Sequence, residues 1–178
     1  MSENNTLSWS KNYSLKWSDF KAEHNPATFE DSHSVIKYGF TWIVDSEKLG
    51  SEVLFFIKNI DLSVEFCPLL SSVRISEAND RLLKHEQGHF DLAELVRREN
   101  ISALQMKFEG KKFQTRGKNE EQRKQFAKED SGKLIAQEVE KIQKILDERI
   151  KKYDKVTDFG NNLEIQSEYN LKFEPLRL

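Results

Sequence analysis

The chain has 178 residues, a length that suits one domain or a domain with a modest extension. Hydrophobic residues make up 37% of it and charged residues 33%, so a core can form beneath a strongly solvated surface. The net charge of −2 gives no basic excess that would favour a nucleic acid, and the single Cys67 excludes an intramolecular disulfide and a cysteine-rich zinc site.

The first 20 residues show no basic segment followed by a continuous apolar run, and no stretch reaches the length of a membrane span. We therefore expect no signal peptide in the chain as given and no membrane span. Two localisations stay open on these grounds, a cytoplasmic protein and a trimmed exported form.

The N-terminal part is predicted to be rich in strand. An aromatic anchor at 15–20 is expected to be a short strand or edge segment on the core. Strict alternation of apolar and polar residues predicts a strand over 35–44. Two further apolar segments, 53–57 and 62–66, predict a second and a third strand, and the spacing favours an antiparallel meander.

The C-terminal part is predicted to be helical. A helix is expected over about 77–108, with Ser76 as its N-cap, followed by a linker over 109–118. Apolar residues recur at intervals of three and four over about 119–153, which predicts a second long helix. A polar tail ends the chain.

A His-Glu-x-x-His motif lies within the first predicted helix. Residues i and i+4 share one face of a helix, so His85 and His89 can offer two imidazole nitrogens to one metal ion. Glu86 is placed where zinc peptidases have the general base that takes a proton from water on the metal. Apolar residues surround the motif, which predicts a buried helix. Gly88 is interpreted either as permitting the close approach of another backbone or as a tolerated imperfection.

The third metal ligand is expected from elsewhere in the fold. With about 100° per residue, Glu94 points away from His89, and Asp91 also points off the metal face. Glu94 is therefore expected to be a buried hydrogen-bond partner. The candidates for the third ligand are Asp154, Asp158, His33, Glu138 and Glu140.

Three groups of residues together resemble a bacterial domain family of unknown function, whose members are described as candidate secreted zinc-dependent proteases. The groups are Leu15-x-Trp17-x-Asp19-Phe20, Leu82-Leu83-x-His85-Glu86-Gln87-x-His89-Phe90-Asp91-x-x-Glu94-Leu95, and Tyr153-Asp154-x-x-Thr157 with Gln166 downstream. The resemblance covers most of the chain and implies a zinc-peptidase-like helix with the tail lying over it. It brings no known substrate.

The chain departs from the pattern of this family at one position. The family has a histidine two residues after the threonine of the tail, and this chain has Phe159 there. If that histidine is the family's third zinc ligand, Phe159 cannot replace it. Asp158 adjoins the position and is therefore placed first among the candidates.

These observations predict an α+β fold in which a small N-terminal antiparallel sheet precedes two long helices, the first carrying the motif. We expect a single zincin-like domain over 1–178, with a β-rich part at 1–76 and a helical part with the tail at 77–178. Zincin-like here means built around an HExxH zinc-binding helix.

The predicted function is a Zn²⁺-dependent hydrolase, expected to be a peptidase, that acts on a peptide or protein substrate with Glu86 as base. The alternative is a catalytically impaired zincin-like protein that binds a partner protein, which Phe159 favours. A structural helical protein with an incidental motif is the third possibility.

Overall fold

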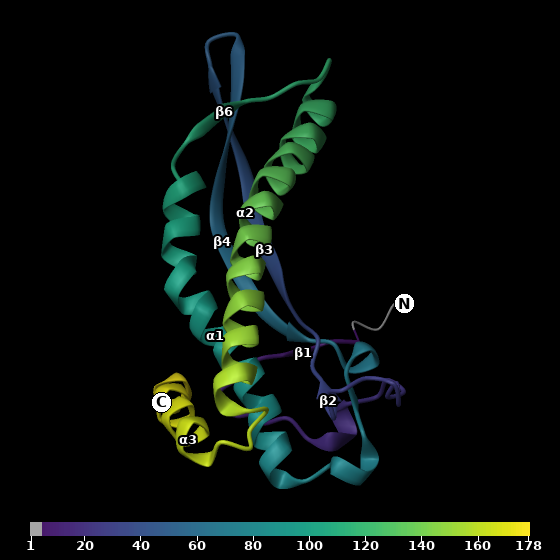
Figure 1. The fold of residues 1–178 in the computed structure, drawn as a ribbon. Coiled ribbons are helices and arrows are strands. Elements are labelled where there is room, and N and C mark those ends of the chain that lie inside the picture. The colour runs from purple at the N-terminus through teal and green to yellow at the C-terminus, as the bar shows by residue number, and fades with distance from the viewer. Residues whose placement is uncertain (1–4) are drawn as a thin grey trace.

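The computed structural model describes residues 5–178 and has α+β architecture, as predicted (Figure 1). In chain order its strands and helices are β1 (Leu7–Ser8), β2 (Ser32–His33), β3 (Ile36–Leu49), β4 (Glu52–Phe66), β5 (Ser72–Val73), α1 (Asp80–Phe108), β6 (Lys112–Gln114), α2 (Glu120–Thr157) and α3 (Leu163–Phe173). Short 3-10 turns occupy Trp17–Asp19, Pro68–Leu70, Ile75–Glu77 and Glu174–Arg177.

The sheet is built on a long antiparallel hairpin, in which β3 pairs with β4 over nearly their whole length. The strand order is β1–β4–β3, and β6 also pairs with β4. Because β3 occupies one edge of β4 along its length, β1 and β6 pair with the opposite edge at its two ends. Within residues 5–178, the outer edge of β3 therefore carries no further strand. β2 and β5 form a separate two-stranded ladder.

The predicted meander of three strands is corrected by the structure. Segments 53–57 and 62–66 belong to one strand, β4. Between them Asn59 adopts a left-handed conformation, with φ of 53°, and the register with β3 shifts between Thr41 and Ile43. Such a bulge inserts an extra residue and bends a strand without ending it. The polar residues around Asn59 were expected to form a turn between two strands, but they form a bulge within one strand.

The N-terminal anchor is a turn in the structure, where a strand was predicted. Trp17–Asp19 forms one turn of 3-10 helix, and the Asp19 carboxylate accepts a bond from the Lys16 amide. Phe20 is buried, and its ring packs edge-on against that of Phe66. The apolar contacts are those expected, but local capping by Asp19 decides the backbone conformation.

Helix α1 begins at Asp80, three residues later than predicted, because Asn79 and not Ser76 is its N-cap. The Asn79 side chain accepts a bond from the Leu82 amide, whereas Ser76 lies inside the preceding 3-10 turn. Asn is as favourable as Ser at the N-cap position, so the residue directly before the helix occupies that position.

Helix α2 is longer at its C-terminal end than predicted. It extends beyond Tyr153 to Thr157 and ends where Asp158 adopts a left-handed conformation. Asp154 therefore lies in the last helical turn, and its position is fixed by the helix. Within the linker predicted over 109–118, Lys112–Gln114 forms the short strand β6.

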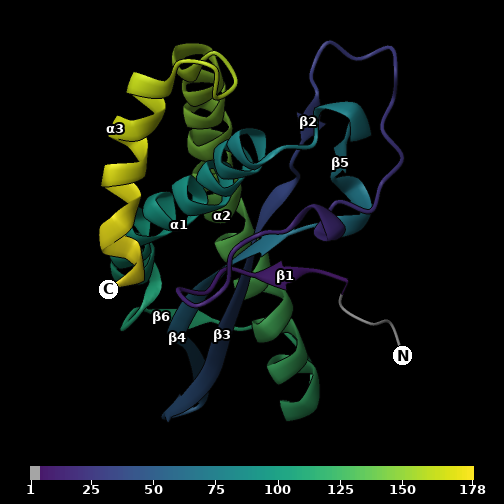
Figure 2. The same ribbon diagram turned by 90° about the horizontal axis from the view of Figure 1, so that it is seen from below.

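The two long helices pack against different strands of the hairpin, α1 chiefly against β4 and α2 against β3. Helix α3 lies against both of them, on the side away from β2 and β5 (Figure 2). One apolar cluster connects residues from Leu15 to Leu176 and fills the space between sheet and helices. Within residues 5–178, no helix combines the length and apolar character needed to cross a bilayer.

Candidate metal centre

Helix α1 presents both histidines of the motif on one face. His85 and His89 are one helical turn apart, and their ring centroids are 4.9 Å apart. Both side chains are almost completely buried. The helical spacing therefore brings the two rings to one face, as the sequence predicted.

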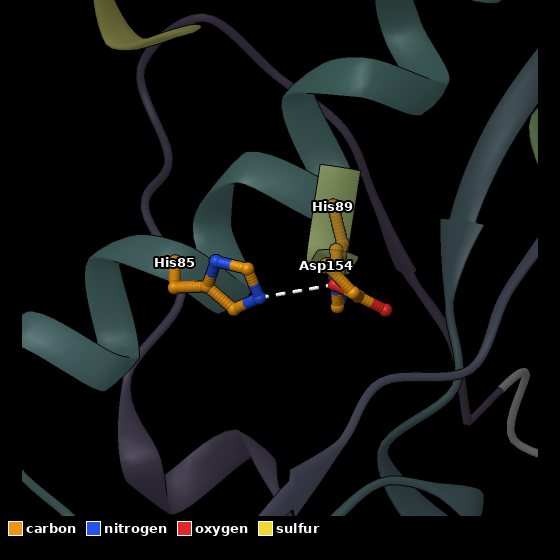
Figure 3. Close-up of side chains that lie close together, drawn as sticks. All are labelled: His85, His89 and Asp154. Carbon is orange, nitrogen blue, oxygen red and sulfur yellow. Dashed lines mark hydrogen bonds and ion pairs between the residues drawn. The ribbon is translucent and has the colours of Figure 1, made fainter. Parts of the chain in front are cut away.

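The carboxylate that meets the two imidazoles belongs to Asp154, in the last turn of α2 (Figure 3). Its Oδ1 atom lies 3.1 Å from His85 Nε2 and 2.5 Å from His89 Nε2. The three donor atoms lie within 4.8 Å of one another, so His85, His89 and Asp154 form a group that could hold a metal ion.

The outer nitrogen of His85 is held by residues of the C-terminal part. His85 Nδ1 lies 3.0 Å from Gln166 Oε1, which can only accept, so Nδ1 carries the proton and Nε2 is left to bind. Gln166 Nε2 donates to the hydroxyl of Tyr153, and this hydroxyl donates to the carbonyl of His85. The Tyr153 ring stacks on the His85 ring at 4.6 Å.

The outer nitrogen of His89 is held by Glu86. His89 Nδ1 lies 3.0 Å from Glu86 Oε2, and the Glu86 carboxylate also accepts bonds from the hydroxyls of Ser32 and Ser34. Ser32 belongs to β2 and Ser34 lies between β2 and β3, so these serines connect the motif helix to the segment before β3. Both histidines thus have an acceptor on Nδ1 and direct Nε2 to the same point, an arrangement typical of metal-binding histidines.

The charges of the site depend on one another. Burial alone raises the pKa of Glu86, but the facing imidazole of His89 outweighs burial and lowers this pKa to about 2. Burial lowers the pKa of His89, but Glu86 and Asp154 raise it to about 10. Burial raises the pKa of Asp154, yet its bonds to the two histidines hold that pKa well below the usual range. Without a metal ion, the protonated imidazole of His89 lies between the two carboxylates of Glu86 and Asp154.

Two glycines allow other elements to approach the motif helix. A Cβ atom on Gly88 would lie 2.0 Å from the Tyr153 hydroxyl, and one on Gly160 would lie 2.9 Å from His85 Cβ. Gly160 also has φ of +83°, a conformation that favours glycine. The group that approaches Gly88 closely is the side chain of Tyr153 in α2. Another backbone was one of two interpretations from the sequence, and the structure corrects this to a side chain.

The ranking of the third-ligand candidates is corrected, because Asp154 lies beside the histidines and Asp158 does not. Asp158 is exposed and serves as the left-handed C-cap of α2. His33 is exposed and pairs with Glu30 on the wall of the pocket. Within residues 5–178, none of the remaining candidates joins the group: Glu138 pairs with Lys107 and Lys141, and Glu140 is an exposed residue of the pocket wall.

Glu94 and Asp91, which the sequence places off the metal face, form hydrogen bonds with residues outside the candidate metal group. Glu94 is buried and accepts bonds from Arg97 and Arg98. Asp91 accepts bonds from Trp9 and Arg177, among others. The angular prediction along the helix therefore holds for both acids, which lie outside the candidate metal group.

Phe159 lies near the site, half-buried and in a left-handed conformation. Its ring centroid is 6.5 Å from that of His85 and 6.3 Å from that of Phe29. Its carbonyl accepts a bond from Arg81 of α1. The tail thus lies over the motif helix, and an apolar ring borders the metal group.

The site opens into a pocket of about 720 Å³ between α2 and the β2–β3 segment. Glu86, His89 and Asp154 line one part of it, together with Phe159, and α2 supplies most of the opposite wall. A molecule in the pocket can therefore reach Glu86, His89 and Asp154.

Sequence reasoning missed Ser32 and Ser34, which carry no recognisable pattern in a polar loop. Gln166 stood in the tail motif, but nothing in the sequence linked it to His85.

Comparisons with protein-family models, curated proteins and solved structures find no match for this chain.

Proposed function

We propose that this protein is a zinc-dependent hydrolase that cleaves peptide bonds. The observation that supports the proposal is the convergence of His85, His89 and Asp154, with the Glu86 carboxylate beside them in an accessible pocket. The resemblance to candidate zinc-dependent proteases points the same way and stays a prediction.

The donor set fits Zn²⁺. Two imidazoles and one carboxylate are the ligand types that catalytic zinc sites use, and three protein ligands leave one position open. Each imidazole is held by an acceptor on Nδ1, which keeps Nε2 available. A bound Zn²⁺ supplies a Lewis acid that polarises a carbonyl and acidifies a water.

Glu86 is suited to accept a proton from a water in the pocket. Its two carboxylate oxygens offer about four acceptor positions. His89, Ser32 and Ser34 occupy three of these, so one remains for a water. The same contacts fix the carboxylate in place, which a general base requires.

Metal content is the first test. Purified protein loaded with zinc and then dialysed should retain about one Zn²⁺ per chain, since one group of ligands is present. His85→Ala, His89→Ala and Asp154→Asn should each remove or greatly weaken it. Asp158→Asn is the matched control, because Asp158 lies outside the group, and should retain the metal. Native protein without metal after zinc is supplied would end the proposal.

Hydrolysis is the second test. Cleavage of an unfolded protein such as casein should depend on added Zn²⁺ and should be abolished by Glu86→Gln, which keeps the side-chain shape but cannot take up the proton. The variant should retain zinc. Wild-type rates in Glu86→Gln would show that Glu86 is not the base.

A second candidate function is zinc-dependent binding of a partner protein without cleavage. Phe159, beside His85 in place of the histidine of the resembled family, favours it. Zinc bound at one per chain, together with no cleavage of any unfolded substrate by the wild type, would select this candidate.

A further inference from the structure

A second hollow, the distal groove, lies at the end of the molecule away from the metal group. There the tip of the β3–β4 hairpin and the first turns of α2 diverge, while the chain after β6 crosses between them (Figure 1). The groove measures about 1030 Å³, larger than the pocket at the metal group. Its lining includes Trp42, Val44, Phe55 and Ala127 as apolar residues.

The outer edge of β3 is covered beside the metal group and open beside the groove. The Gln143 side chain accepts from the Tyr38 amide and donates to the Ile36 carbonyl, so it takes the place of a neighbouring strand. Lys128 Nζ donates to the Trp42 carbonyl and lies 3.6 Å from the centre of its ring. Among residues 5–178, Trp42 is the last residue of β3 whose main chain bonds to a side chain of α2.

Beyond Trp42 the edge of β3 faces the groove. Alternate residues of an antiparallel strand direct their main-chain groups to the same side, so Val44, Ser46 and Lys48 follow Trp42 outward. The Ser46 amide bonds to the neighbouring Asp45 side chain. Among residues 5–178, the amides of Val44 and Lys48 and the carbonyls of all three residues have no hydrogen-bond partner on this outer edge. An open strand edge is a template for pairing with another extended segment.

The groove is basic, although the chain as a whole carries a net charge of −2. Its lining holds the cations Lys48, Arg123, Lys124 and Lys128 and the acids Asp45 and Glu120. Asp45 is already paired with Lys58, which lies outside the lining, and Glu120 is paired with Lys124. Within the described part of the chain, neither Lys48 nor Arg123 forms an ion pair with an acid. A ligand of negative charge is therefore favoured.

We propose that the distal groove binds an acidic peptide segment in extended conformation, which adds to the outer edge of β3. Main-chain groups at Val44, Ser46 and Lys48 bond to the backbone of the segment, as in recognition by strand addition. The acidic side chains of the segment lie on the same face of the sheet as Lys48 and point towards Lys48 and Arg123, while its apolar side chains lie on the opposite face. This site is separate from the metal group and does not depend on the proposed function.

The test uses a labelled octapeptide of alternating valine and glutamate with the full chain, followed by fluorescence anisotropy. Eight extended residues span about 26 Å, enough for the open edge and the groove. Saturable one-to-one binding is expected. A peptide of alternating valine and lysine should not bind, and neither should the acidic peptide with every second amide N-methylated on the bonding side.

Variants of the chain separate charge from strand addition. Lys48→Glu and Lys124→Glu should each weaken binding by about tenfold, whereas Lys133→Glu, an exposed residue of α2 outside the groove, should not. Val44→Pro should also weaken it by about tenfold, because it removes an outward amide without breaking the pairing with β4. Circular dichroism checks that each variant is folded, and the N-methylated peptide tests strand addition if Val44→Pro is not.

Four outcomes would overturn the proposal. These are no binding, equal binding of both peptides, equal loss in Lys133→Glu, and binding that N-methylation leaves unchanged. Tight binding of a single-stranded oligonucleotide at the same residues would show that the groove recognises anions in general. Self-association of the wild type that Val44→Pro abolishes would mean that a second copy covers the edge.

Discussion

At the scale of single residues, the position of His85 depends on the smallest side chains near it. Gly88 leaves room on α1 for the Tyr153 hydroxyl, and this hydroxyl bonds to the His85 carbonyl and to Gln166. Gly160 lets the tail approach His85 from another direction. A helix-weakening residue inside the motif is thus required by packing, and its loss should affect both stability and the site.

Gly88→Ala should destabilise the protein, although alanine is about 1 kcal/mol better than glycine in a helix. Its methyl group would meet the Tyr153 hydroxyl at 2.0 Å, and overpacking in a buried position costs about 1–3 kcal/mol. The free energy of unfolding in urea measures the effect. Ser102→Ala, exposed on the same helix, is the control and should be neutral or stabilising. Equal stability of Gly88→Ala and the wild type would mean that Tyr153 can move aside.

Phe159→His should tighten metal binding, because the side chain borders the group and a third imidazole would add a ligand. We expect at least a roughly tenfold lower Kd for Zn²⁺. Competition with a chromophoric chelator measures the Kd. Phe159→Leu keeps an apolar side chain without a donor atom, so it should leave the Kd near that of the wild type. An unchanged Kd in Phe159→His would show that residue 159 cannot reach the metal.

At the scale of elements, α2 performs different tasks along its length. Near its start Ser131 accepts a bond from the Trp42 indole and fixes the helix to β3. In the middle Gln143 replaces a strand on the edge of β3, and in the last turn Asp154 meets the histidines of α1. One continuous helix therefore sets the distance between the sheet edge and the metal group.

Gln143→Leu should open the edge of β3 beside the metal group. The Tyr38 amide and the Ile36 carbonyl would lose their partner, and each lost bond costs about 1 kcal/mol. Hydrogen exchange at the Tyr38 amide should become faster, while the fold is retained. Gln137→Leu, an exposed residue of the same helix, is the control. Unchanged exchange at Tyr38 would show that the Gln143 contact does not protect this edge.

At the scale of the whole molecule, the candidate metal group connects the two long helices. His85 and His89 come from α1, and Asp154 comes from the far end of α2. A metal ion held by all three would therefore bind only the folded chain, and its binding free energy would stabilise the packing of both helices.

Zinc should raise the thermal stability of the wild type, and a chelator should reverse this. At a free zinc concentration of 100 times Kd the stabilisation is about 2.7 kcal/mol. Differential scanning calorimetry with and without zinc measures it. Asp154→Asn should lose most of the shift, and Asp158→Asn should keep it. An equal shift in Asp154→Asn would place the bound zinc somewhere else.

The sequence by itself determined which residues of the motif share one face of α1, and it determined the class of the fold. The spacing of His85 and His89 sets a common face through the helical repeat alone, and the same repeat turns Glu94 away from it. Alternation and the three-four repeat likewise predicted strands followed by two long helices. These features depend on local periodicity, which the order of residues contains directly.

Only the tertiary structure decided what meets that face. The sequence placed Asp158 ahead of Asp154, yet the last turn of α2 holds Asp154 against α1, and Asp158, the left-handed residue that ends α2, lies in solvent. Ser32 and Gln166 reach the site from segments more than 50 residues away from their partners. Such contacts arise from packing between elements, which local patterns do not encode, and for this reason the helix was predictable and the residues around it were not.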